Sequence, residues 1–287
     1  RELRESGHEG TARAYASSLR SMQRYLGKKD FPFIKLSSRI ISDYQGKLLA
    51  SGICDNTIGF YLHNIKALFR KGCREMGLEL PCPFRDISIK TKKTLKRSLD
   101  PVVIKTLSAI ELEKDSPLSL ARDIFMFSFY TRGMSFVDIA LLKKRHVFPG
   151  EICYRRHKTD QLMRVGINKE ISRILERYKN VPGEYIFPLF PAERDPYAGY
   201  RNAYHRIRYS LGKISRVIGL EFPLRLHAAR HSWATIAKVN GASVHVIGEC
   251  LGHTSEKTTR IYLKELDHSA LDAVNNQVAD FILAVDD

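Results

Sequence analysis

Apolar residues recur every three or four positions through the first 88 residues, which is the spacing of one face of a helix. The pattern is interrupted twice, where Ser37 or Ser38 offers an N-cap and where Asp55 and Asn56 precede the next apolar run. The predicted helices cover residues 10–27, 38–50 and 56–77. They predict a small helical bundle at residues 1–88.

Beyond Pro101 the apolar spacing is again mostly helical, with one exception. Residues 151–156 and 162–167 alternate apolar and polar side chains around a polar segment at 157–160. This alternation predicts a β-hairpin that carries Lys158 at its tip. The predicted helices cover residues 118–130, 136–143 with Ser135 as cap, 168–180, 197–219, 226–240, 243–251, 256–265 and 267–285.

The length of 287 residues exceeds the usual size of one domain and predicts two. The first is the helical bundle at 1–88, and the second, at 101–287, is mainly α with a small antiparallel sheet. Residues 89–100 between them show no apolar periodicity and are interpreted as a linker. Its positive charge fits two hypotheses. The basic side chains are either simply exposed to solvent, or they lie along the phosphates of a nucleic acid. The linker cations are Lys90, Lys92, Lys93, Lys96 and Arg97.

The charge of the chain narrows the class of partner. Lys and Arg number 47 against 31 Asp and Glu, so the formal net charge is +16. Positions 1–100 hold 20 basic and 10 acidic residues, and the remainder holds 27 and 21. Such an excess favours a polyanion, with nucleic acid as the leading candidate and the N-terminal part as the electrostatic clamp. The alternative is a basic surface that only aids solubility.

The cysteines and the apolar runs indicate a cytoplasmic protein without a membrane partner. The five cysteines are widely spaced and include no Cys-x-x-Cys pair, so they are interpreted as reduced, buried thiols. No apolar run approaches the length of a membrane span, and the basic, polar start has no apolar signal core. The chain begins at Arg1 rather than Met, which fits a fragment of a longer protein.

Residues able to attack a phosphodiester gather near the C-terminal end. His227 and Arg230 stand three apart on one predicted helix face, where both can grip one phosphate. His231 stands four residues after His227, but Ala228 replaces the Glu of a His-Glu-x-x-His zinc motif, so His231 is interpreted as structural and no metal site is expected. A Gly precedes His253 and predicts that this imidazole projects from a turn.

Three linked motifs make the sequence similar to one family. His-x-x-Arg-His at 227–231, Leu-Gly-His-Thr at 251–254 and Thr-Thr-x-x-Tyr at 258–262 resemble the C-terminal signature of the tyrosine recombinases, the phage integrase family. The likeness covers about residues 1–275. It implies the tyrosine recombinase fold, in which a helical core-binding domain precedes an α+β catalytic domain.

The resemblance implies a role for each matching residue. Tyr262 matches the nucleophile that attacks a DNA phosphate and leaves a 3′-phosphotyrosine link and a free 5′-hydroxyl. Arg230 matches the second active-site Arg, and His227 the partner that serves as base or hydrogen-bond donor. His253 matches the residue that hydrogen-bonds the phosphate, and Lys158 the Lys that protonates the leaving oxygen. The phosphotyrosine stores the bond energy, so neither ATP nor a metal cofactor is required.

The first active-site Arg of the family is not found at its usual place. The family reads Gly-Leu-Arg where this chain reads Gly133, Met134 and Ser135, so Ser135 occupies the Arg position. Arg132 lies three residues earlier and is interpreted as the functional substitute, against the alternative that it only caps its helix. Asp138 matches an acidic residue that supports the next helix. This departure resembles a branch of conjugative-transposon integrases and DNA invertases.

The lead hypothesis is a site-specific recombinase of a mobile element, which integrates, excises or inverts double-stranded DNA. The expected partners are duplex DNA, a homotetramer on that DNA and DNA-bending accessory proteins. The last predicted helix is amphipathic and is expected to pack either on its own catalytic domain or on an adjacent protomer. The alternatives are a type IB topoisomerase, which relaxes DNA by the same chemistry, and a DNA-binding regulator that lost catalysis. Contacts from the N-terminal helices to DNA are expected from Lys66, Arg70 and Lys71.

Overall fold

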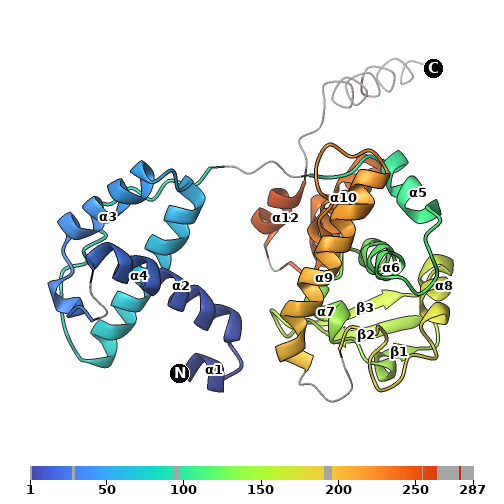
Figure 1. Cartoon of the computed structure of the whole chain (residues 1–287), viewed down its shortest axis with the longest axis horizontal. Coiled ribbons are helices and arrows are strands. Elements are labelled where there is room, and N and C mark those ends of the chain that lie inside the picture. The colour runs from blue at the N-terminus through green and yellow to red at the C-terminus, as the bar shows by residue number, and fades with distance from the viewer. Residues whose placement is uncertain are drawn as a thin grey trace. The chain divides into compact units, whose positions relative to one another are not determined.

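The structure, a computed structural model, confirms a mainly helical chain with one small antiparallel sheet (Figure 1). It describes residues 2–27, 30–92, 97–190, 196–253, 255–263 and 278. Backbone contacts divide the chain into two compact units, residues 1–94 and 95–287. The predicted helix at 267–285 lies outside the described residues except for Val278, which is helical and exposed. Lys93 and Lys96 also lie outside them.

The first unit contains the three predicted helices and one short helix before them. Ser37 caps α3, because its side chain accepts a hydrogen bond from the amide of Ile40. Buried apolar faces of the long helices meet in a single core, and the Tyr44 hydroxyl donates to Ser21 Oγ over 2.8 Å inside it. The helices are α1 (Glu2–Glu5), α2 (Glu9–Leu26), a 3₁₀ turn (Phe33–Lys35), α3 (Ser38–Ala50) and α4 (Asp55–Glu75).

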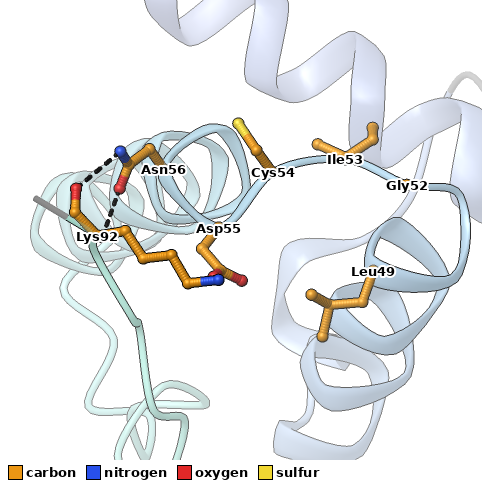
Figure 2. Close-up of a pocket in the computed structure, with 7 residues that line it drawn as sticks. All are labelled: Leu49, Gly52, Ile53, Cys54, Asp55, Asn56 and Lys92. Carbon is orange, nitrogen blue, oxygen red and sulfur yellow. Dashed lines mark hydrogen bonds and ion pairs between the residues drawn. The ribbon is translucent and has the colours of Figure 1, made fainter. Parts of the chain in front are cut away.

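The start of the predicted linker is bound to the N-terminus of α4. Figure 2 shows the Asn56 side chain pairing with the main chain of Lys92, where Oδ1 accepts over 2.8 Å and Nδ2 donates over 3.0 Å. Lys92 Nζ also lies 2.8 Å from Asp55 Oδ2. At the other end of the predicted linker, Arg97 lies over the Phe222 ring and Leu99 is buried in the second unit. Each end of this basic segment therefore contacts the unit next to it, while the Lys92 and Arg97 side chains remain exposed.

The second unit is built around α6 (Pro117–Tyr130), which is apolar on nearly every side and therefore buried. It packs against α5, α7, α8, α9 and α10 (Figure 1). The buried carboxylate of Asp123 on α6 accepts hydrogen bonds from Arg122, Arg177 and Tyr178 and ties α6 to α8. The other helices are α5 (Pro101–Ala109), α7 (Phe136–Ala140), a 3₁₀ turn (Lys144–His146), α8 (Lys169–Arg177), α9 (Pro196–Val217), α10 (Leu226–Val239), α11 (Val244–Leu251) and α12 (Glu256–Tyr262).

The predicted hairpin is confirmed and gains a third strand. β2 (Glu151–Arg155) pairs antiparallel with β3 (Leu162–Gly166), and β1 (Val147–Phe148) adds to the other edge of β2. Along β2 and β3 buried and exposed positions alternate, as the sequence pattern predicts. The segment between the strands projects Lys158 in a turn.

The cysteine prediction is wrong in one respect. All five thiols are free, but Cys54 is exposed and the other four are only half-buried, so none is a core residue. Residues so far apart form no periodic pattern from which burial can be predicted, and the general frequency of cysteine in protein cores was a poor guide here. Among the described residues, no helix has both the length and the apolar character needed to cross a membrane.

Candidate active site

Arg230 lies at the centre of the candidate site, in the second turn of α10. Its side chain is buried, with 5% of its surface exposed. Nη1 donates to the Gly133 carbonyl over 2.8 Å, and Nη2 donates to the Leu251 carbonyl. Nη2 also lies 3.0 Å from His253 Nε2. One guanidinium therefore joins α10 to the loop after α6 and to the end of α11, with its plane fixed by backbone oxygens.

The loop after α6 requires a glycine beside Arg230. Gly133 has a φ of 74°, and a Cβ there would lie 2.8 Å from the Arg230 Cα. Its amide donates to the Ser128 carbonyl over 2.7 Å, which closes a Schellman-type end on α6. Arg132, just before it, takes a φ of 59°, a left-handed conformation that costs a non-glycine residue about 1 kcal/mol. The Arg132 side chain reaches the Arg164 carbonyl at 3.5 Å.

His253 projects from the turn that ends α11, as predicted, because Gly252 takes a left-handed φ of 64°. Burial, together with the nearby cations of Arg230, Arg156 and Lys158, lowers the pKa of His253 to about 4. The ring is therefore neutral at pH 7. Since a guanidinium can only donate, Nε2 accepts from Arg230 and Nδ1 carries the proton. That proton is donated to Thr259 Oγ1 over 3.0 Å.

Thr259 connects this histidine to α12. The residue is fully buried, and α12 packs against α10 and α11. A Cβ at Gly248 of α11 would lie 2.8 Å from Thr259 Oγ1, so the Thr259 side chain lies directly against the backbone of α11. Tyr262 is the last residue of α12, one turn after Thr259 on the same helix face. Its side chain lies outside what the structure describes.

Ser135 and Asp138 hold the hairpin turn. Ser135 caps α7, as predicted, and its hydroxyl donates to Asp138 Oδ2 over 2.6 Å. Asp138 Oδ1 accepts from the amide of His157 over 2.8 Å. Lys158 follows His157 directly and is exposed in the turn. The buried carboxylate therefore fixes the base of the turn that presents the Lys158 ammonium.

Sequence reasoning missed Arg156 between β2 and this turn. Its Nη1 donates to the Gly252 carbonyl over 2.5 Å, one residue after the carbonyl that Arg230 Nη2 contacts. The C-terminus of α11 has partial negative charge and thus holds two guanidiniums from distant segments. Burial and Asp138 raise the pKa of the buried Tyr154 phenol, and the cations of Arg156, Arg230 and Arg132 oppose that rise. The only feature of the sequence that could have drawn attention to Arg156 is its position two residues before Lys158.

His227 is exposed at the start of α10, one turn before Arg230. Its ring meets that of His231 edge to face, with 4.8 Å between centroids. His231 is buried, in keeping with a structural role. The two imidazoles therefore stand side by side, with His227 on the solvent side of the pair.

The predicted DNA contacts in the first unit differ in their ion pairs. Arg70 and Lys90 are exposed, and Lys66 is half-buried on α4. Lys71 Nζ lies 2.8 Å from Glu2 Oε2 and 3.3 Å from Glu75 Oε1, so carboxylates compete for it.

A basic groove on α9 was not expected from the sequence. Ala203, Ile207, Leu211 and Ile214 bury one face of the helix. The opposite face is exposed and cationic because basic residues recur on it at helical spacing. The groove is lined by His205, Arg208, Tyr209, Gly212, Lys213, Arg216, Pro223 and Arg225.

Comparisons with known proteins agree with both units. Residues 98–268 match the Phage integrase family, and residues 1–86 match the Phage integrase SAM-like domain. Tyrosine recombinase XerC of Shewanella oneidensis is 26% identical over 226 residues, which cover 75% of this chain and 70% of XerC. Tyrosine recombinase XerD of Pseudomonas putida is 24% identical over 262 residues, which cover 88% of this chain and 86% of XerD.

Solved structures show the same fold. A lambda integrase dimer bound to a COC′ core site has a TM-score of 0.65 at 18% identity, covering 88% of this chain and 89% of that one. The Tn1549 transposon integrase in complex with a circular intermediate DNA has a TM-score of 0.65 at 16% identity, covering 93% and 99%. With the family match across more than half of its residues, the chain belongs to the phage integrase family and is a site-specific tyrosine recombinase.

Proposed function

We propose that this recombinase cleaves and rejoins duplex DNA through a covalent 3′-phosphotyrosine link at Tyr262. The observation that carries the proposal is the pair of buried Arg230 and half-buried His253, which contacts the hairpin of Lys158 at the end of α11 and is hydrogen-bonded through Thr259 to the helix of Tyr262. The hairpin, α10 and the segment from the end of α11 to α12 meet there. The hairpin and α10 carry the cations, and the third segment carries His253 and Tyr262.

The bond changes balance without a cofactor. The Tyr262 oxygen forms a bond to phosphorus while the bond from phosphorus to the 5′-oxygen breaks. The phenol loses its proton, and the 5′-oxygen gains one to become a hydroxyl. One phosphodiester replaces another, so the energy of the cleaved bond is retained. Attack by a 5′-hydroxyl on the phosphotyrosine reverses the step and seals a strand.

Two proton transfers in this step need a residue each. An unperturbed phenol has a pKa near 10, so Tyr262 must lose its proton as it attacks. His227 is exposed one turn from Arg230 and serves as base or hydrogen-bond partner. Lys158, presented by the turn that Asp138 fixes, protonates the leaving 5′-oxygen. The proposal thus assigns one group to each end of the reacting phosphate.

Negative charge grows on the non-bridging oxygens as phosphorus becomes five-coordinate. A guanidinium fixed in advance stabilises this state more than the diester ground state. Arg230 meets that requirement because three of its contacts are already made in the protein. Arg132 is proposed to assist, and its left-handed backbone is the type of strain that gathers at functional sites.

The duplex is proposed to contact cations of both units. The groove on α9 offers Arg208, Lys213 and Arg216 to phosphates, and the exposed Arg70 and Lys90 do so in the first unit. Two DNA sites must be held together for strands to be exchanged, which supports a tetramer on DNA assisted by bending proteins. The same substrate puts the enzyme in the cytoplasm with the DNA.

A suicide duplex nicked near the cleavage point tests the proposal. The protein is expected to trap a covalent adduct that survives denaturation, and Tyr262→Phe is expected to form none because it lacks the attacking oxygen. An adduct that persists in Tyr262→Phe would contradict the proposal. Transfer of the trapped strand to a second duplex then separates recombination from topoisomerase-like relaxation.

The part assigned to Arg132 has its own test. Arg132→Ala is expected to slow adduct formation by about 100-fold, by analogy with the loss of one oxyanion donor. Arg132→Lys is the matched variant, because it keeps the charge at the same backbone position. Cleavage by Arg132→Ala at the rate of the unmodified chain would show that Arg132 only ends its helix.

A further inference from the structure

Arg156 is a half-buried cation between β2 and the turn that carries Lys158. Its side chain makes one hydrogen bond to the described residues, from Nη1 to the Gly252 carbonyl over 2.5 Å. No carboxylate of those residues lies within ion-pair distance of it. Its sequence neighbour Arg155 is exposed instead and lies 3.3 Å from Asp160 Oδ2. The two adjacent arginines thus have different surroundings.

The Gly252 contact brings Arg156 to the phosphate-binding side of the site. Gly252 immediately precedes His253. The carbonyl of Leu251, the residue before Gly252, accepts a hydrogen bond from Arg230. Two guanidiniums and the Lys158 ammonium consequently surround one imidazole, and their charge contributes to its low pKa. Like charges repel one another unless an anion lies between them. Such a cluster is suited to a bound phosphate.

A second guanidinium is also what the site lacks at its usual place. Ser135 caps α7 and contacts Asp138, so it supplies no positive charge. An Arg has five N–H donors in a planar fork, of which Arg156 uses one on the described residues. The remaining donors match the oxygens of a phosphate.

We propose that Arg156 is a catalytic residue, which contacts a non-bridging oxygen of the scissile phosphate together with Arg230 and adds to Arg132 a further guanidinium where Ser135 supplies none. The inference rests on the proposed function, since it concerns the same phosphate. Arg156 holds its place through the end of α11, so the helix that presents His253 also orients the second cation.

Single-turnover cleavage of the suicide duplex tests this at saturating protein. Arg156→Ala is expected to form the adduct about 100-fold more slowly than the unmodified chain. Arg155→Ala is the matched control and is expected to stay within about 2-fold, because surface ion pairs contribute little. Arg156→Gln keeps an N–H donor for the Gly252 carbonyl but no charge, and it is expected to show the same defect as Arg156→Ala.

A neutral substrate separates charge stabilisation from a structural role. In a methylphosphonate duplex one non-bridging oxygen is replaced by a methyl group, which removes the negative charge at the scissile position. The defect of Arg156→Gln is expected to fall from about 100-fold to a few-fold on this duplex, since little charge remains for a guanidinium to stabilise. The ratio is taken within each variant, so incomplete folding does not affect it.

The outcomes separate the two proposals. Cleavage by both Arg156 variants at the rate of Arg155→Ala would overturn the inference. An equal defect on the charged and neutral duplexes would overturn it too, because Arg156 would then act only by holding the hairpin to the His253 turn. In both cases the unmodified chain still forms its adduct and the proposed function stands. Failure of the unmodified chain to form any adduct removes the function itself.

Discussion

The two units hold their cations in opposite ways. In the first unit, Lys71 and Lys92 are exposed by 40% and 80% and pair with nearby carboxylates. In the second unit, Arg230 is 5% exposed and bonds to backbone carbonyls and an imidazole. The first third of the chain has the larger charge excess, yet the organised site lies in the other unit. The net charge therefore indicates a polyanionic partner, whereas the buried and hydrogen-bonded Arg230 indicates where the chemical step takes place.

The physical basis is the cost of rearrangement. An exposed ion pair is worth about 0 to 1 kcal/mol, so a phosphate displaces its carboxylate easily. Such cations add affinity for DNA but do little to orient the reacting phosphate. A buried guanidinium held by carbonyls has already lost its freedom during folding, and it stabilises developing charge without reorganising.

The largest effect is expected from a change that keeps charge and removes geometry. Arg230→Lys retains one positive charge but cannot reach the Gly133 and Leu251 carbonyls together. Adduct formation in single turnover is expected to fall by about 100-fold or more. Arg70→Lys, the matched change on exposed α4, is expected to leave the rate unchanged. Equal effects in the two units would break the comparison.

Much of the fold follows from sequence because its signals are local. Ser37 and Ser135 cap helices where the pattern predicts them, and the alternation at 151–156 yields β2. Arg156 had no such signal, since its contact crosses many residues and is neither periodic nor capping. The contact of Arg156 with Gly252 spans 96 residues. Packing alone determines which residues meet there.

The next effect concerns how the catalytic helix is held. Thr259→Val keeps the shape of the side chain but removes the hydroxyl that His253 Nδ1 contacts. A loss of about 10-fold in adduct formation is expected, because α12 loses its polar link to the Arg230 and His253 pair. DNA affinity should not change. Thr259→Ser retains the hydroxyl and is expected to keep the rate close to normal.

A result in which Val and Ser slow the reaction equally would assign the effect to packing against Gly248. Ring ¹⁵N shifts of His253 provide an independent readout. They are expected to show the Nδ1–H tautomer in the unmodified chain and a mixture of tautomers in Thr259→Val.

A smaller effect follows from the cations around His253. The folded state binds a proton at His253 only near pH 4, whereas the unfolded chain binds it near 6.5. The unfolded state therefore takes up more protons between these values, and stability falls as pH drops from 6.5 to 4. His253→Asn is expected to flatten this part of the unfolding-midpoint profile measured by calorimetry. An unchanged slope would mean that His253 is not held neutral by its surroundings.

The smallest effects belong to the first unit, and two neighbours on α4 sharpen them. Arg70 is exposed, whereas Lys71 is already held by Glu2 and Glu75. Arg70→Ala is expected to weaken DNA binding a few-fold and to reduce the slope of log K against log salt by about 0.9, one phosphate contact. Lys71→Ala should change both less, because its carboxylates already offset its charge. At saturating protein neither variant should slow cleavage, and a slowed rate for Arg70→Ala would mean that the first unit also acts on the reacting phosphate.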